Sequence, residues 1–275
     1  MMGLATMRIT DLALAATREA LAPLERFYGG QLAIPAGPDP GGADPAGTLE
    51  LRGTLELRVG ETRLRFGRAP EPALPTPSGA GEPFYHLALL VPGDRFDAAH
   101  DWLAAEAELL SRPGSDATVF EFEAWQARAC YCHDPAGNIL ELIAHRGVAE
   151  GRRGRGRFSG RELAGISEIG VVVPSPARAT ELLSTRLGLD LWDGAVQEGG
   201  GLGFVGSKAR TLILCAPGRG WLPTGRPAEI HPVDVTLSGP RAGERPGARP
   251  GEVRLPDTPH RIRVSPGAGS AAEWG

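Results

Sequence analysis

Cysteine is scarce in this sequence, with only Cys130, Cys132 and Cys215 among 275 residues. A small, odd number of thiols cannot build the disulfide framework of a secreted domain, and it fits a reducing compartment. The N-terminal segment lacks the uninterrupted apolar core of a signal peptide, and no apolar run approaches the roughly 18 residues of a membrane span. These absences predict a cytoplasmic protein with no membrane partner.

An excess of positive charge is also missing. Lys and Arg together number 29 against 33 Asp and Glu, which gives a net charge of -4 at pH 7. Such a chain has no field that would draw it to a phosphate backbone, so nucleic acid is not expected as a partner. The sequence contains no dinucleotide fingerprint, Walker sequence, GxSxG elbow or HExxH helix. We expect a small-molecule substrate as the partner, and a homodimer is a possible assembly.

The length and composition indicate about two globular domains. Hydrophobic residues make up 41% and charged residues 23%, which is ordinary for a soluble protein. The clearest break is a run of glycine-spaced arginines within residues 147–162, which is typical of a linker. We therefore expect a first domain over residues 1–146, a solvated linker over 147–163 and a second domain over 164–275.

Residues 84–146 form the clearest structural unit. The apolar run from His86 to Val91 is ended by Pro92 and predicts a buried strand. Apolar residues at helical spacing follow, after an Asp94 that could cap the helix. Three β-prone runs complete the unit, the last from Ile139 to Ile143. The predicted order is β-α-β-β-β.

The same order recurs more weakly, which predicts four modules in all. The first module begins at Ile9, the third at Ile166 and the fourth near Val233, where a loop over residues 239–251 takes the place of the helix. Aligning the first strands of the four modules places one polar residue of each in the same column. These residues are Asp11, His86, Glu168 and Asp234.

The run HDPAGNILELIAHR (residues 133–146), preceded by FYHLALLVP in the same module, resembles the vicinal oxygen chelate superfamily. This superfamily includes lactoylglutathione lyases, extradiol ring-cleaving dioxygenases and bleomycin or fosfomycin resistance proteins. The resemblance covers the first three modules well and the fourth poorly. It implies an α+β fold in which four βαβββ modules pair into two curled mixed β-sheet domains, the second of them degenerate.

The resemblance also implies a divalent cation (iron, manganese, nickel or zinc) held by first-strand and last-strand residues of two modules. His86 falls on a first-strand ligand position, Glu141 on a last-strand position and Asp11 on the first-strand position of the first module. Arg65 falls where the family often has a second Glu, and an arginine cannot ligate a cation. The expected metal ligands are therefore Asp11, His86 and Glu141, with Glu141 also as the catalytic residue and Arg65 and His145 as substrate-binding residues.

Each of these residues also has a structural interpretation. His86 could be a structural histidine, and Asp11 could be an exposed residue at the end of a strand. Cys130 and Cys132 are more typical of structural thiols than of a metal site, because further ligands are missing. Trp221 lies in a proline-bounded loop that could cover a cavity or pack against a sheet.

Two functions of different classes follow. The favoured function is a metal-dependent isomerase, lyase or ring-cleaving dioxygenase, in which the cation polarises vicinal oxygen atoms of a small substrate. The alternative is a metal-free small-molecule binding or resistance protein of the bleomycin-resistance type, in which Arg65 contacts Glu141 or an anionic ligand. We expect His86 and Glu141 to lie side by side on one concave sheet face, with Arg65 pointing into the same cavity.

Overall fold

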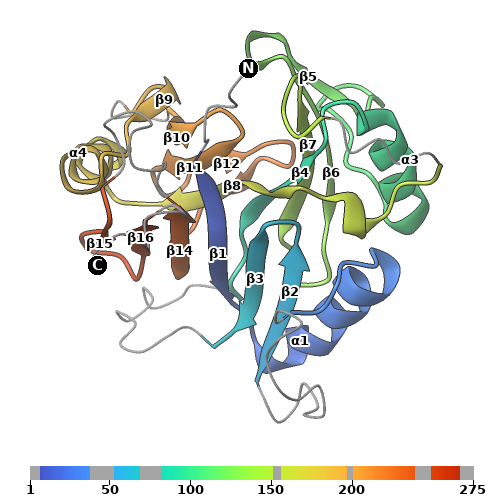
Figure 1. Cartoon of the computed structure of the whole chain (residues 1–275), viewed down its shortest axis with the longest axis horizontal. Coiled ribbons are helices and arrows are strands. Elements are labelled where there is room, and N and C mark those ends of the chain that lie inside the picture. Colours follow the sequence, from blue (N-terminus) through green and yellow to red (C-terminus); the bar gives the residue numbers. More distant parts are fainter. Residues whose placement is uncertain are drawn as a thin grey trace, which may run out of the picture.

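The computed structural model describes residues 7–37, 53–68, 82–150, 156–196, 201–238 and 249–266 (Figure 1). The helices are α1 (Arg18–Glu25), the π-helical turn η1 (Arg26–Gln31), α3 (Phe96–Glu106), the 3-10 turns η2 (Glu123–Trp125) and η3 (Gly160–Glu162), and α4 (Pro176–Leu187). The strands are β1 (Arg8–Ala15), β2 (Thr54–Val59), β3 (Thr62–Gly67), β4 (His86–Val91), β5 (Phe120–Phe122), β6 (Ala127–His133), β7 (Ile139–His145), β8 (Gly165–Val172), β9 (Leu191–Gly194), β10 (Gly203–Ser207), β11 (Arg210–Cys215), β12 (Gly220–Trp221), β13 (Arg226–Pro227), β14 (Val233–Ser238), β15 (Gly251–Arg254) and β16 (Arg261–Ser265). The expected α+β class is confirmed. No helix among these residues is both long enough and apolar enough to cross a membrane.

The strands form two large sheets, and each sheet takes its strands from two modules. Sheet A has the order β15-β16-β14-β1-β3-β2, and sheet B has the order β5-β6-β7-β4-β8-β11-β10-β9. Modules adjacent in the sequence were expected to pair, the first with the second and the third with the fourth. Instead β1 pairs antiparallel with β14, and β4 pairs antiparallel with β8. The first module therefore shares a sheet with the fourth, and the second with the third.

The chain between the second and third modules helps to bring β4 and β8 together. Phe158 is buried, and its ring centroid lies 5.2 Å from that of Trp102 on α3. Arg95 forms an ion pair with Glu162 at 3.0 Å, and the Ala164 N–H donates to the carbonyl of Leu90 at 2.9 Å. The end of the expected linker is thus packed rather than solvated. Its residues 151–155 lie outside the described residues, as do residues 239–248 of the loop in the fourth module.

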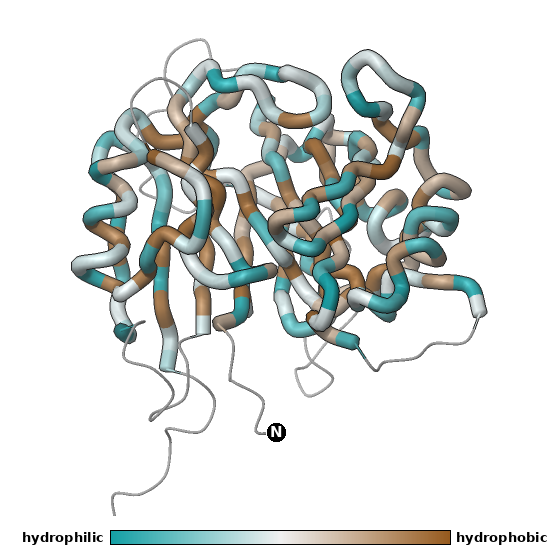
Figure 2. Tube along the Cα trace, turned by 90° about the horizontal axis from the view of Figure 1, so that it is seen from above, coloured by the Kyte–Doolittle hydropathy of each residue, from teal (hydrophilic) through white to brown (hydrophobic). Residues whose placement is uncertain are grey.

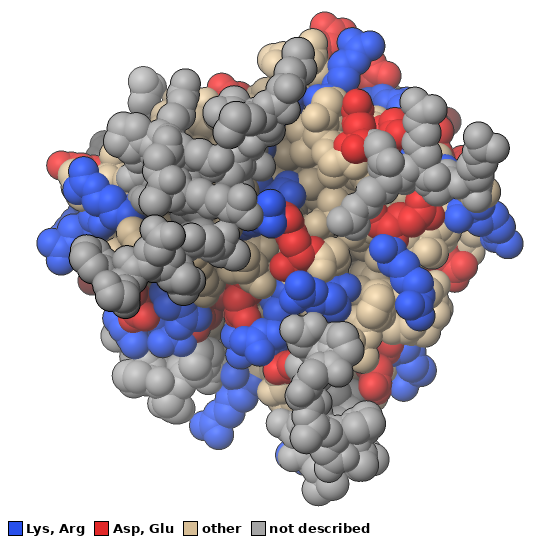
Figure 3. Space-filling model, in the orientation of Figure 1, with Lys and Arg blue, Asp and Glu red and all other residues tan. Residues whose placement is uncertain are grey.

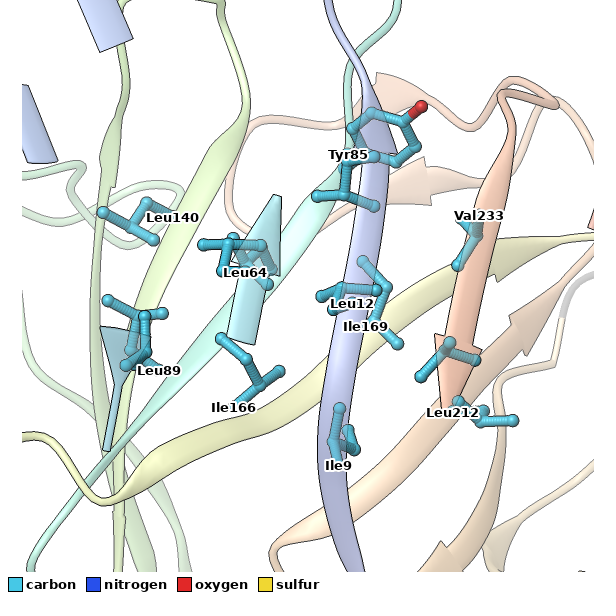
Figure 4. Close-up of a cluster of buried hydrophobic side chains, with 14 of the residues drawn as sticks. Ile9, Leu12, Leu64, Tyr85, Leu89, Leu140, Ile166, Ile169, Leu212 and Val233 are labelled. Atoms are coloured by element: carbon cyan, nitrogen blue, oxygen red, sulfur yellow. The ribbon is translucent and has the colours of Figure 1, made fainter. Parts of the chain in front are cut away.

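A shared apolar core lies between the two sheets. Leu12 and Leu64 of sheet A belong to one buried cluster with Leu140 and Ile169 of sheet B (Figure 4). Successive residues of a strand point to opposite faces, so polar and apolar residues alternate along several strands (Figure 2). The helices lie at the sides, with α4 opposite α1 and α3 (Figure 1). Polar residues that alternate with the core leucines must therefore face away from the other sheet.

Two helix starts differ in how well the sequence predicts them. α4 follows Ser175, whose side chain accepts a hydrogen bond from the Arg178 N–H, and Gly188 ends it with a φ of 64°, as glycine readily does. The N-cap of α3 is Arg95 rather than the expected Asp94, and no side-chain hydrogen bond caps this helix. Packing of Phe96 in the core, at 1% exposure, therefore holds the start of α3 in place of a cap.

The Asp-Pro-x-Gly-Asn turn positions the strand that follows it. Asp134 Oδ1 accepts hydrogen bonds from the N–H groups of Ala136 and Asn138, at 2.9 and 3.0 Å, and Oδ2 accepts from the Asn138 side chain and the Tyr28 hydroxyl. Asn138 Oδ1 in turn accepts from the Tyr85 N–H at 2.8 Å, directly before β4. This turn therefore fixes β7 against β4. It determines which β4 residue lies opposite each residue of β7.

Candidate functional site

The strand register brings three predicted or aligned residues to one face of sheet B. Glu141 lies opposite Ala88 in the parallel pair β4–β7, and Ala88 lies opposite Glu168 in the antiparallel pair β4–β8. His86 is two residues before Ala88 and therefore points to the same side. Leu87 belongs instead to the core between the sheets. His86, Glu141 and Glu168 thus share the face of sheet B that points away from sheet A.

His86 and Glu141 are in direct contact. His86 Nε2 lies 2.8 Å from Glu141 Oε2, and the two residues are only 5% and 2% exposed. Because a carboxylate oxygen accepts, Nε2 is the nitrogen that carries the hydrogen in this pair. The Tyr131 hydroxyl donates to Glu141 Oε1 at 3.0 Å. The predicted side-by-side placement of His86 and Glu141 is confirmed, and both carboxylate oxygens of Glu141 are engaged.

Tyr131 stays protonated in this environment. Burial raises its pKa well above 10.0, and the negative charge of Glu141 raises it further. A protonated phenol is a donor, so Tyr131 holds Glu141 in one orientation. Tyr131 lies directly opposite Glu141 in the β6–β7 pair. Tyr131 was not among the predicted site residues, although it stands two positions before the HDPAGNILELIAHR motif.

Glu168 completes the site from the third module. It is 2% exposed, and burial raises the pKa of its carboxyl group well above 4.5, with a further increase from the negative charge of Glu141. Its Oε1 has no hydrogen-bond partner among the described residues. The first-strand alignment pointed to Glu168, but the expected pairing of modules placed it in the other half of the protein. The observed pairing of β4 with β8 brings it to the same sheet face as Glu141, on the other side of β4.

Aromatic side chains close this face of the sheet. Trp221, on the hairpin β12–β13, packs edge-on against His86 with 5.1 Å between ring centroids. Gly170 on β8 leaves room for the indole, because a Cβ at that position would lie only 2.8 Å from Trp221 Cη2. Phe120 packs against Tyr131 at 4.8 Å. Trp221 is 2% exposed, so His86 and its neighbours lie beneath a cover.

His145, which was predicted to bind substrate, lies on the same strand as Glu141. Its ring is fully buried and stacks on Trp125 with 6.5 Å between centroids. Burial, together with the charges of Lys208 and Arg210, lowers its pKa to about 4, so His145 is neutral at pH 7. Neither ring nitrogen has a hydrogen-bond partner among the described residues. Substrate binding by His145 stays a prediction that would require Trp125 to move.

Asp11 and Arg65 belong to sheet A and contact each other. Arg65 Nη2 lies 2.5 Å from Asp11 Oδ1, and Arg63 Nε lies 2.6 Å from Asp11 Oδ2. The residues on either side of Arg65 enter the core, so its side chain points away from sheet B. Asp11 therefore does not join His86 and Glu141, and Arg65 does not compensate Glu141. Both expectations assumed that the first and second modules form one sheet.

The site does not fit a metal ion as its residues lie. Among the residues that the structure describes, no three His, Cys, Asp or Glu side chains come together in a way that could hold one. His86 and Glu141 are directed at each other, and Glu168 favours its protonated form, whereas a cation needs deprotonated ligands. The iron, manganese, nickel or zinc implied by the resemblance stays a prediction.

The cysteines are free and buried. Burial raises the pKa of Cys132 and of Cys215 to about 12, so neither forms the thiolate that a metal site or a nucleophile requires. Their structural interpretation is therefore the better one.

Similarity of this chain to known proteins is found in structure and not in sequence. No family model matches the chain, and no curated protein matches it. Among solved structures, a predicted dioxygenase from Bacillus subtilis matches with a TM-score of 0.53 and 12% identity, covering 97% of this chain and 87% of its own. Glyoxalase I from Zea mays matches at 0.45 and 10%, covering 94% and 92%. A glyoxalase/dioxygenase from Nostoc punctiforme matches at 0.32 and 22%, covering 50% and 90%. At these identities the similarity concerns the fold alone.

Proposed function

We propose that this chain, which has the fold of the vicinal oxygen chelate superfamily, is a small-molecule isomerase or lyase that transfers protons at the buried carboxyl groups of sheet B. The observation that carries the proposal is that Glu141 and Glu168, both 2% exposed, lie on one face of sheet B, on the two strands that flank β4. Two carboxyl groups in a buried site oppose each other's ionisation, which costs folding free energy. Buried groups with perturbed pKa values are typical of catalytic acids and bases.

The protonation states give the two carboxyl groups different roles. Burial raises the pKa of Glu168 well above 4.5 and so favours its protonated form, which can donate to a carbonyl oxygen of the substrate. Glu141 is oriented by His86 and Tyr131 and can accept a proton from a hydroxyl-bearing carbon next to that carbonyl group. Removal of a proton from carbon, with protonation of the adjacent carbonyl oxygen, gives an enediol. Glu141 then returns its proton to the neighbouring carbon, while the other hydroxyl of the enediol gives its proton to Glu168. This forms the isomeric carbonyl compound and restores both carboxyl groups, and no electrons are gained or lost overall.

Substrate would reach these groups only after the Trp221 hairpin moves. This closed aromatic face favours the second candidate function, a binding protein that encloses an apolar or aromatic ligand without chemistry. The two functions differ in what happens to a bound molecule. Only the enzyme exchanges protons between a ligand carbon and water.

The test follows proton exchange in heavy water by nuclear magnetic resonance. The probe is the hemithioacetal of methylglyoxal and glutathione, which has oxygen on two adjacent carbons. We expect the wild-type protein to replace a carbon-bound proton by deuterium, and Glu141→Gln to slow this exchange by about a hundredfold or more. Glu181→Gln, an exposed site on α4, is the matched control. Binding of the probe without exchange would favour the binding protein.

The same proteins test the cation that the resemblance implies. Melting temperatures are measured for wild type, Glu141→Gln and Glu181→Gln with and without added manganese, iron, nickel or zinc. We expect no ion-specific increase that depends on Glu141. An increase that is present in wild type and lost in Glu141→Gln would replace this proposal by the metal-dependent enzyme.

A further inference from the structure

Sheet A carries an open cavity on the face that points away from sheet B. The cavity has a volume of about 320 Å³ and is lined by residues of β1, β3, β14 and β16. This volume lies at the lower end of the roughly 300–1,000 Å³ of small-molecule pockets. Ala13, with its small side chain, lines it towards the end of β1. Space for a small ligand therefore exists on the sheet opposite the proposed catalytic groups.

Two clusters of one aspartate and two arginines flank this cavity. In the first, Asp11 on β1 is held by Arg63 and Arg65 on β3. The second has the same arrangement in the fourth module, with aspartate on the first strand and arginines on the last. Asp234 accepts from Arg261 Nε at 2.9 Å and from Arg263 Nη2 at 2.6 Å.

The strand register relates the clusters by symmetry. Asp11 lies opposite Arg63 in the β1–β3 pair, and Asp234 lies opposite Arg261 in the β14–β16 pair. Both strand pairs are parallel, and the second arginine of each cluster follows the first by two residues. Basic and acidic atoms accordingly lie side by side over the centre of the molecule in Figure 3.

The clusters contain more positive charge than internal pairing needs. Four guanidinium groups face two carboxylates within the clusters. Two further carboxylates, Glu56 on β2 and Glu252 on β15, act on the same arginines but do not line the cavity, whereas Arg65, Arg261 and Arg263 do. One arginine would be enough to pair each aspartate. Arg65 lines the cavity, and its buried Nε has no hydrogen-bond partner among the described residues. Each guanidinium carries five N–H donors, a pattern that matches carboxylates.

We infer that this cavity binds a small organic dianion, a dicarboxylate, with one carboxylate at Arg65 and the other at Arg261 and Arg263. Strands β3 and β16 are three strand spacings apart across β1 and β14, which is about 14 Å. Long arginine side chains that reach inward from both strands leave a shorter gap, which two carboxylates on a short carbon chain can span. Arg65, Arg261 and Arg263 are 28%, 25% and 30% exposed, so a ligand can reach them. The inference is independent of the proposed proton chemistry, which uses the other sheet.

The test is calorimetric titration of the full chain with succinate, and with succinamide as the uncharged probe of the same shape. We expect saturable binding of succinate and none of succinamide. Arg65→Met and Arg263→Met should each weaken succinate binding by about tenfold or more, because each removes a charged hydrogen-bond donor pair. Arg128→Met, which removes an arginine of sheet B paired with Asp97, should leave the affinity unchanged.

Arg65→Met and Arg263→Met should both fold as the wild type does. Asp11 keeps Arg63 when Arg65 is replaced, and Asp234 keeps Arg261 when Arg263 is replaced, so no buried carboxylate loses its last partner. Melting temperatures of the free variants check this. Absence of succinate binding up to about 10 mM would overturn the inference. Equal affinity in wild type and both cavity variants would overturn it too, as would inorganic phosphate binding as tightly as succinate, because a single anionic group would then suffice.

Discussion

Glu168→Gln should stabilise the folded protein increasingly as pH rises. The substitution keeps the size of the side chain and removes its ionisation. Glu168 is 2% exposed, and burial followed by the charge of Glu141 raises its pKa well above 4.5. In the unfolded chain the same carboxyl group ionises near its ordinary value of roughly 4.3. At a pH between the pKa of the unfolded chain and the raised pKa of the folded protein, the unfolded state has released a proton that the folded state retains.

The proton that Glu168 retains in the folded state determines the sign and the size of the change in stability with pH. When the folded state binds one more proton than the unfolded state, the free energy of unfolding falls with rising pH by at most about 1.4 kcal/mol per pH unit. The favourable contribution is complete below the unfolded pKa and is lost as pH rises towards the folded pKa. Gln at this position cannot ionise, so the variant escapes this loss. The difference in stability between variant and wild type should therefore grow by up to about 1.4 kcal/mol for each pH unit above roughly 4.5.

The measurement is urea unfolding of both proteins at about pH 5, 6, 7 and 8. Taking the difference between variant and wild type removes the contribution of titrating groups that do not interact with residue 168. Glu181→Gln, on the exposed side of α4, controls for the loss of one negative charge. The reasoning would be refuted if the stability of Glu168→Gln and wild type changed in parallel over this range, or if Glu181→Gln gave the same growing difference.

Gly170→Ala should displace Trp221, because the added Cβ would lie 2.8 Å from its indole. Quenching of the tryptophan fluorescence by acrylamide should therefore increase. Unchanged quenching would contradict the close packing. His260→Gln should lose less stability than wild type between about pH 6.5 and 4. Burial lowers the pKa of His260 to about 4, so only the unfolded chain takes up a proton in that window, an effect of about 3 kcal/mol. Urea unfolding at both ends of the window measures it, and an equal loss in both proteins would be evidence against it. Asp134→Ala should lower the free energy of unfolding by about 3 kcal/mol or more, because it leaves the buried Tyr28 hydroxyl without its acceptor and frees the turn before β7. A melting temperature near that of wild type would show that the turn does not fix this strand.

The sequence predicted what is local to one module. His86 and Glu141 lie on strands β4 and β7 of the same module, and their contact needs only the register that the Asp134 turn imposes. The position of Glu168 beside them was not predictable, because it depends on which first strands pair. The first strands are all short and largely apolar, and their pattern does not specify a partner.

The same ambiguity explains the misplaced residues of sheet A. Asp11 and Arg65 were correctly identified as matching positions of one module, and the structure brings them together at 2.5 Å. Their expected association with Glu141 was wrong because β1 pairs with β14 and not with β4. The sequence left two alternatives for Trp221, which could cover a cavity or pack against a sheet. In the structure it packs over His86 on sheet B. Gly170, which makes room for it, carries no signal in the sequence without knowledge of that contact.

The nested pairing of the modules has a consequence for how the chain folds during synthesis. Sheet B uses only the middle of the chain, and it can form while the ribosome is still adding the fourth module. Sheet A must wait, since the side chain of Thr10 bonds to the carbonyl of Thr236, 226 residues later. Until then β1 has an unpaired edge, which is the kind of surface that invites pairing with other chains. Loss of the last module would therefore damage the beginning of the protein more than its middle.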